Sequence, residues 1–203
     1  YYKGLVLITL FVFSAVVLYF LDPIAQDLAY HRFSDCRSFF GINHFMDVLS
    51  NFPFLVIGFM GIRLAGKAYR KKTMIFFLMT FVLFVGVFLT GLGSAFYHYD
   101  PTNFTLIFDR LPMTLVFTPF FATIIYDYVD RRMGTFVFYS FMILGVYSIF
   151  YWYYTEIIGV GDLRLYAFVQ FFPIVVVPLI LLFYNNGKQY TKQILLVFGA
   201  YTI

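Results

Sequence analysis

Residues Met74 to Tyr97 read MIFFLMTFVLFVGVFLTGLGSAFY, and none of them carries a charged side chain. A helix needs about 20 consecutive apolar residues to cross a hydrocarbon core roughly 30 Å thick. This stretch is long enough and apolar enough to do so. It therefore predicts a membrane-spanning α-helix rather than a helix of a soluble domain.

The whole chain has the composition of a membrane protein. It contains 62% hydrophobic and 12% charged residues, with a mean hydropathy of +0.85. Soluble domains carry roughly 45–50% apolar and about 25% charged residues. We therefore predict an all-α multi-pass membrane protein. Six apolar runs are long enough to span and a seventh is shorter: about 4–21, 47–65, 74–97, 104–126, 135–154, 165–184 and 193–203.

These runs predict one transmembrane domain over residues 1–203. The seventh run has about half the length needed to span, so we expect the chain to continue beyond Ile203. The first run follows Lys3, as in a signal peptide. At about 18 residues it is long for a signal peptide's apolar core, and no A-x-A-like cleavage site follows. This favours a retained helix. Cys36 is the only cysteine, so the sequence has no disulfide framework and no cysteine metal cluster.

Positive charge is uneven between the two sides of the membrane. Ten Lys or Arg residues flank one set of loops, three (Arg32, Arg37 and Arg164) flank the other, and Arg110 lies inside a span. The positive-inside rule then places the N-terminus in the cytoplasm and the first, third and fifth loops in the periplasm, lumen or exterior. The net charge of +4 lies mostly in loops, which fits topology signals rather than nucleic-acid binding.

Polar residues gather where the third and fourth runs meet. The sequence reads GLGSAFYH at 91–98, DPTN at 100–103 and DRLPM at 109–113. Proline disfavours a helix in the residue before it, and Thr or Asn caps the next helix. We therefore expect a tight hairpin. Ser94 and Asp109 lie at nearly equal distances from Pro101, so both fall about 10–12 Å from the turn, with His98 roughly 6 Å nearer the surface.

The residue types in this hairpin suit hydrolysis by a metal-activated water. A neutral imidazole such as His98 binds zinc, the Asp109 carboxylate can move a proton, and the Ser94 hydroxyl can donate to an oxyanion. A carboxylate inside a span costs on the order of 3 kcal/mol, which favours a functional role. The alternative is a structural Ser94–Asp109 pair. Arg110 is a poor partner for Asp109 because adjacent residues point to different helix faces. Because catalytic zinc usually has three protein ligands, His31 and His44 are second-choice candidates for completing a site.

The motif GLGS at 91–94, His98 four residues later and the DRLPM run resemble the alkaline ceramidase family. That family belongs to a superfamily of membrane hydrolases which includes the progestin and adiponectin receptors. The run Asp47-Val-Leu-Ser-Asn51-Phe-Pro-Phe also resembles the family's first core helix. The resemblance covers the chain from about Asp27 onward. It implies a seven-helix core preceded by one extra N-terminal helix, with the C-terminal core helix missing from this sequence.

The resemblance assigns roles to the same hairpin. It implies that His98 is a zinc ligand, that Asp109 handles protons and that Ser94 assists near the metal. The other two zinc histidines come from an H-x-x-x-H on the family's last core helix, which we expect after Ile203. Some members also bind calcium. Asp35 is a candidate match for one calcium ligand, but His44 stands where a glutamate is expected, so matching residues do not support a calcium site here.

Two functions from different classes follow. The first is an intramembrane zinc-dependent amidase that cleaves ceramide, or a related lipid amide, into a long-chain base and a fatty acid. An aromatic content of 24% suits a cavity for acyl chains. The alternative is a seven-helix receptor-like protein with a structural or weakly hydrolytic zinc site. A transporter ranks last, because few ionisable residues lie in the spans. The oligomeric state is open.

Overall fold

The computed structural model describes residues 2–68, 73–184 and 191–202. Within these ranges the chain is α-helical and contains no β-strand. A short 3₁₀ helix, Leu28–His31, precedes α2. The α-helices are α1 (Tyr2–Phe20), α2 (Phe45–Leu49), α3 (Phe52–Ala68), α4 (Met74–Tyr99), α5 (Asn103–Tyr128), α6 (Arg131–Ile157), α7 (Arg164–Phe183) and α8 (Thr191–Thr202).

The described helices agree with an all-α multi-pass membrane protein. Five of them are long and apolar enough to cross a membrane: Phe45–Lys67, Met74–Tyr99, Asn103–Tyr128, Arg131–Ile157 and Arg164–Phe183. The first of these joins α2 and α3 across a short break at residues 50–51. Helix α1 contributes a shorter apolar stretch, Gly4–Phe20. The single-domain organisation and the orientation in the membrane stay predictions.

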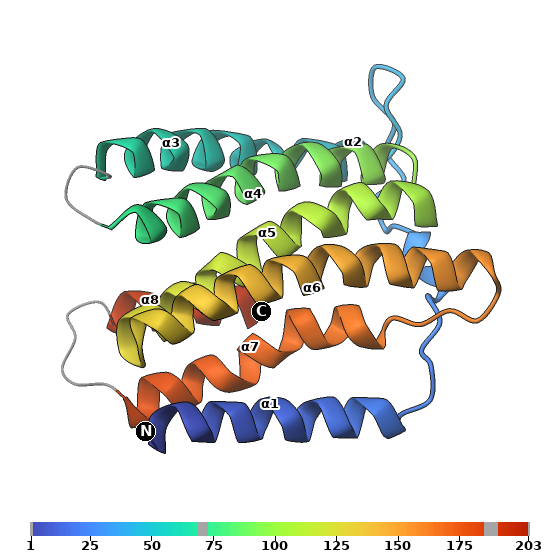
Figure 1. The fold of residues 1–203 in the computed structure, drawn as a ribbon. Helices are drawn as coiled ribbons and strands as arrows, with labels where there is room; N and C mark the ends of the chain where they lie inside the picture. The colour runs from blue at the N-terminus through green and yellow to red at the C-terminus, as the bar shows by residue number, and fades with distance from the viewer. Residues whose placement is uncertain (1, 69–72, 185–190, 203) are drawn as a thin grey trace.

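Neighbouring helices run side by side along one axis (Figure 1). Helix α4 packs against α3 and α5, helix α5 also packs against α6 and α7, and α1 lies against α7. The segment 21–44, the α4–α5 turn and the α6–α7 connection lie at one end of the bundle (Figure 1), which we call the site end.

Two apolar clusters stabilise the bundle. The larger joins α4, α5, α6 and α7 and includes Met79, Phe121, Phe141 and Val177. The smaller lies nearer the site end and includes Tyr97, Leu106 and Trp152. Helix α5 contributes to both clusters and is half buried along its length. The residues of α4 and α5 near the turn are therefore held in a fixed register against each other.

Candidate active site

The α4–α5 turn is fixed by local hydrogen bonds. Helix α4 ends at Tyr99, and Asp100 closes it by donating its N–H to the Phe96 carbonyl at 3.2 Å. Thr102 and Thr105 then form a capping box at the start of α5, with backbone N–H to hydroxyl distances of 3.1 and 3.0 Å. The chain therefore reverses in a few residues, as the DPTN sequence predicts.

A close approach of the two helices sets the depth of the site. A Cβ atom added at Gly93 would lie 1.8 Å from the Phe108 carbonyl oxygen and 3.3 Å from the Asp109 nitrogen. Only glycine fits there, so α4 and α5 touch backbone to backbone. Ser94, the next residue, is the hydrogen-bonding neighbour of the Asp109 carboxyl group. The expectation that Ser94 and Asp109 share one depth is confirmed.

His98 lies one helical turn nearer the site end than Ser94. Its side chain is 24% exposed, but its Nδ1 atom is buried and has no hydrogen-bond partner. That nitrogen lies 4.0 Å from Asp47 Oδ2. Asp109 and Asp47 are the carboxylates that act on the imidazole electrostatically. The structure therefore brings Ser94, His98 and Asp109 together and adds Asp47 to them.

Part of the segment 21–44 covers this cluster. The Phe33 ring lies 4.4 Å from the His98 ring, centroid to centroid. The two ring nitrogens of His31 each lie 2.9 Å from a partner, the Tyr97 hydroxyl and the Asn103 side-chain oxygen. His31 thereby fastens the segment to both helices of the hairpin. Both of its ring nitrogens are thus engaged in hydrogen bonds, and its role as a metal ligand stays a second-choice prediction.

The other candidates from this segment are engaged with each other. His44 Nδ1 lies 2.6 Å from the Asp35 carbonyl oxygen. The Asp35 carboxylate accepts from Arg37 Nε at 2.5 Å and from the Met46 backbone N–H at 2.8 Å. The hydrogen bond from Arg37 lowers the pKa of Asp35 to about 2. Asp35 and His44 therefore hold the segment to the start of α2.

The side chains around His98 include donor groups that zinc accepts as ligands. Zinc takes imidazole nitrogen and carboxylate oxygen, and the half-buried His98 offers a nitrogen near two carboxylates. The buried Nδ1 without a partner is the kind of polar atom that a ligand or a shifted side chain would satisfy. Within the described part of the chain, no three His, Cys, Asp or Glu side chains are grouped to hold a metal. The residues fit one part of a site, and zinc stays a prediction.

An apolar cavity of about 410 Å³ lies one helical turn deeper than Ser94 and Asp109. Thr90 precedes Ser94 by four residues and Met113 follows Asp109 by four, so both lie on the same helix faces as those residues. The lining is Phe54, Val87, Thr90, Met113, Val116, Phe117 and Gln170, from four helices. Its volume lies in the range of about 300–1,000 Å³ common for ligand pockets. An apolar cavity thus adjoins a polar cluster.

Arg110 faces away from this cavity into a cage of aromatic rings. Its guanidinium carbon lies 4.4 Å from the Trp152 ring centroid and 5.0 Å from that of Tyr166. Its Nη2 atom donates to Gln26 Oε1 at 2.7 Å. The Gln26 backbone N–H in turn donates to Glu156 at 2.7 Å. Arg110 therefore joins the segment 21–44 to the bundle, and its hydrogen bond goes to Gln26, in keeping with the expectation that it is a poor partner for Asp109.

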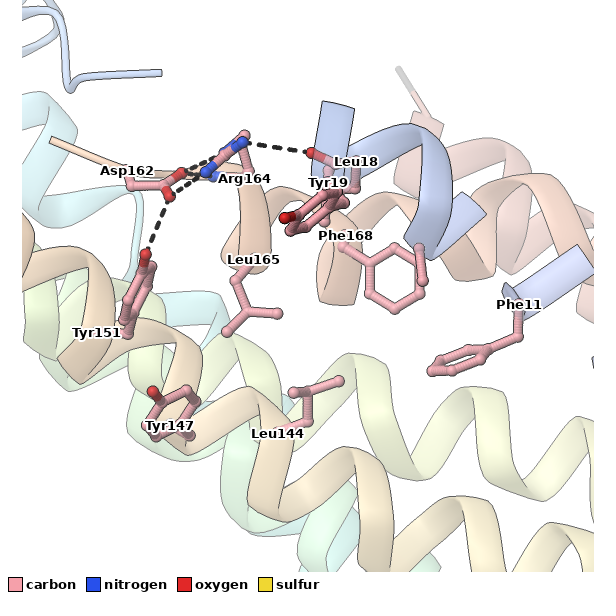
Figure 2. Close-up of a pocket in the computed structure, with 11 residues that line it drawn as sticks. Phe11, Leu18, Tyr19, Leu144, Tyr147, Tyr151, Asp162, Arg164, Leu165 and Phe168 are labelled. Carbon is pink, nitrogen blue, oxygen red and sulfur yellow. Dashed lines mark hydrogen bonds and ion pairs between the residues drawn. The ribbon is translucent and has the colours of Figure 1, made fainter. Parts of the chain in front are cut away.

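A second groove, of about 380 Å³, lies where α1 joins the bundle. Figure 2 shows Arg164 between Asp162 and the end of α1, with Tyr151 donating to Asp162. Arg164 bonds Asp162 at 2.9 and 2.8 Å and also donates to the Leu18 and Leu21 carbonyls. These bonds from Arg164 lower the pKa of Asp162. The polar groups at this groove hold α1 in place.

The arrangement defines a multi-pass α-helical membrane protein with a polar cluster of Ser94, His98, Asp109 and Asp47 at one end of its bundle. The family model described as Ceramidase matches residues 39–202, and the chain belongs to that family. It is therefore a ceramidase-type hydrolase, and the family implies a lipid substrate. Neither the curated proteins nor the solved structures compared with the chain include a match.

Sequence reasoning missed the approach of Asp47 to His98. In the sequence, Asp47 stands only as the first residue of the run from Asp47 to Phe54 and shows no spacing that links it to His98. Its position at the site end of a span, on the same side as His98, was the available signal. The Phe33 contact had no signal of that kind, because it depends on the path of the irregular segment 21–44.

Proposed function

We propose that the protein hydrolyses the amide bond of ceramide, or of a related lipid amide, to a long-chain base and a fatty acid. The observation that supports this most directly is the polar cluster lying one helical turn above an apolar cavity. A lipid amide has the matching shape, because its polar amide sits at the end of long apolar chains. The 410 Å³ cavity would receive part of a chain and hold the amide beside Ser94 and Asp109.

The chemistry assigns a separate role to each side chain. Water adds to the amide carbonyl carbon, the carbonyl oxygen gains negative charge, and the C–N bond then breaks. Asp109 accepts the proton of the attacking water and delivers it to the leaving nitrogen. Ser94 donates a hydrogen bond to the carbonyl oxygen as its charge develops. The proton balance closes, because the water supplies hydroxyl to the acid and hydrogen to the amine.

His98 is the proposed zinc ligand, together with two further histidines that the family resemblance implies. A bound zinc would supply a water that is deprotonated near neutral pH and a positive charge beside the carbonyl. The Asp109 carboxylate is placed to take a proton from such a water, since it lies one turn from His98 and interacts with it electrostatically. We also propose that this cluster faces the periplasm, lumen or exterior, because the site end carries few Lys and Arg residues.

Release of fatty acid from labelled ceramide by the purified full-length protein tests this proposal. We expect product that disappears after chelation and returns when zinc is added. Activity that survives complete removal of zinc would contradict the metal-dependent mechanism. Zinc bound through His98 without any product would favour the receptor-like alternative.

A further inference from the structure

The buried nitrogen of His98 faces a carboxylate that the proposed reaction does not use. Nδ1 of His98 is inaccessible and has no hydrogen-bond partner, and Asp47 Oδ2 lies 4.0 Å away from it. The imidazole as a whole is 24% exposed. Nδ1 is therefore a buried ring nitrogen whose nearby carboxylate is that of Asp47.

The backbone of Asp47 is held firmly while its side chain is partly exposed. Its carbonyl oxygen accepts from Ser50 Oγ at 2.7 Å and from Asn51 Nδ2 at 2.9 Å. The preceding residue, Met46, is bonded through its N–H to Asp35 at 2.8 Å. The Asp47 side chain itself is 34% exposed. Rotation about its side-chain bonds can therefore bring the carboxylate closer without moving α2.

The His98 ring is restricted on one face by the Phe33 ring, 4.4 Å away and tilted by 46°. The Phe33 ring also lies 5.1 Å from the His44 ring, so His44 lies beyond a phenyl ring from His98. A hydrogen bond between Nδ1 and Asp47 needs a distance of roughly 2.8 Å, which is about 1 Å shorter than the separation seen. Such a change is small for a partly exposed aspartate.

We propose that Asp47 is a positioning residue for His98: its carboxylate accepts a hydrogen bond from Nδ1–H and leaves Nε2 as the nitrogen that binds zinc. The inference rests on the proposed zinc site. A neutral imidazole carries one N–H, so a carboxylate at Nδ1 fixes the proton there and frees Nε2. Histidines that bind metals generally have such a partner, which also orients the ring and makes the other nitrogen more basic.

This assignment gives the two carboxylates near His98 different tasks. Asp109 lies beside Ser94 in the α4–α5 contact, at the depth of the proposed reaction. Asp47 comes from α2 and meets His98 at its inward nitrogen. Asp47 acts only through His98, so its loss should weaken metal binding before it affects any later step.

The test is zinc affinity of the purified full-length protein, measured by competition with a chromophoric chelator. Loss of an orienting partner typically lowers metal affinity by about 10–100-fold, which is the loss expected for Asp47→Ala. Asp47→Asn keeps an oxygen acceptor and should lose less. Asp100→Ala is the matched control, because Asp100 is an exposed aspartate at the same end of the bundle. It should bind zinc as the wild type does, and His98→Ala should lose zinc.

The outcomes separate this inference from the proposed reaction. Wild-type zinc affinity in Asp47→Ala would overturn the role of Asp47 and leave the reaction standing. Asp47→Asn losing zinc as fully as His98→Ala would also overturn it, because Asp47 would then hold the metal itself. If zinc binding depends on both Asp47 and His98 but the protein does not hydrolyse ceramide, the inference about Asp47 is supported and the proposed reaction is overturned. The unfolding temperatures of the variants and of the wild type are compared without zinc. Similar temperatures show that a variant has lost zinc affinity and not its fold.

Discussion

Replacing Gly93 by alanine should disrupt the site more than any comparable change elsewhere in the bundle. The added Cβ would lie 1.8 Å from the Phe108 carbonyl oxygen and 2.6 Å from its carbonyl carbon. Both atoms belong to the backbone of α5, so no side chain can move aside. Relieving the contact to an ordinary distance of 3.4 Å requires the helices to separate by roughly 1.5 Å.

The size of this displacement sets the expected loss of stability and of turnover. Overpacking typically costs about 1–3 kcal/mol, and a contact between two helix backbones belongs at the upper end of that range. We therefore expect Gly93→Ala to lower the free energy of unfolding by about 2–3 kcal/mol. The shift also separates Ser94 on α4 from Asp109 on α5. A misplacement of about 1 Å can slow a reaction by roughly 10²-fold, so ceramide turnover should fall by about that factor.

Two other glycines provide matched controls. A Cβ at Gly66 in α3 would meet nothing within 4 Å, so Gly66→Ala should leave both stability and turnover near the wild-type values. A Cβ at Gly134 would lie 2.5 Å from the Tyr126 Cα atom. Gly134 lies near the start of α6, and α6 begins at the end of the bundle opposite the site end (Figure 1). Gly134→Ala should lower stability while leaving the turnover of the folded protein largely intact.

Turnover of labelled ceramide and thermal unfolding in detergent, measured on all three variants, form the assay. Wild-type turnover by Gly93→Ala would refute the claim that the close contact positions Ser94 against Asp109. An equal loss of turnover in Gly134→Ala would show that the effect is general destabilisation instead.

Three further predictions concern the rest of the bundle. The free energies of unfolding of Arg110→Lys, Gln26→Ala and the double variant should show a coupling of about 0.5–3 kcal/mol, because both substitutions remove the same hydrogen bond. Additive changes in the free energy of unfolding would contradict this prediction. In a background without the native cysteine, a membrane-impermeant thiol reagent should label Thr102→Cys but not Arg132→Cys from the outside; the reverse pattern would invert the predicted topology. The pKa of Asp35 is about 2 against an ordinary 3.8, so its stabilising effect is present above about pH 4 and is lost as the pH falls toward 2. The unfolding temperature should therefore fall over that interval in the wild type and fall less in Asp35→Asn.

The depth relation between Ser94 and Asp109 was predictable because it depends only on local geometry. The helical rise is constant, and the DPTN sequence defines a short turn, so counting residues from Pro101 gives the register. The glycine at 93 adds the close approach. The helix positions were predictable for a similar reason, since a run of apolar residues has few stable alternatives in a membrane.

Contacts made by the segment 21–44 could not be predicted in the same way. Phe33 reaches His98, His31 reaches Tyr97, and Gln26 reaches Arg110. Each contact joins an irregular stretch to a helix that is distant in sequence. No period or spacing fixes such a path, because the backbone of the segment follows no regular repeat. The aromatic cage of Arg110 consists of Tyr30, Trp152 and Tyr166, which come from three separate parts of the chain that no sequence pattern brings together.

Comparison of Asp109→Asn with the wild type tests whether Asp109 moves the proton in the proposed hydrolysis of a lipid amide. Purified full-length wild type and Asp109→Asn are assayed on labelled ceramide at equal zinc content. Loss of general acid–base catalysis should lower the turnover rate of Asp109→Asn by about 10²–10⁴-fold, while the near-isosteric amide leaves the protein folded. Ser94→Ala, which removes one hydrogen-bond donor, should lose no more than about 10²–10³-fold. Turnover by Asp109→Asn at the wild-type rate would contradict the mechanism and leave a structural Ser94–Asp109 pair as the better explanation.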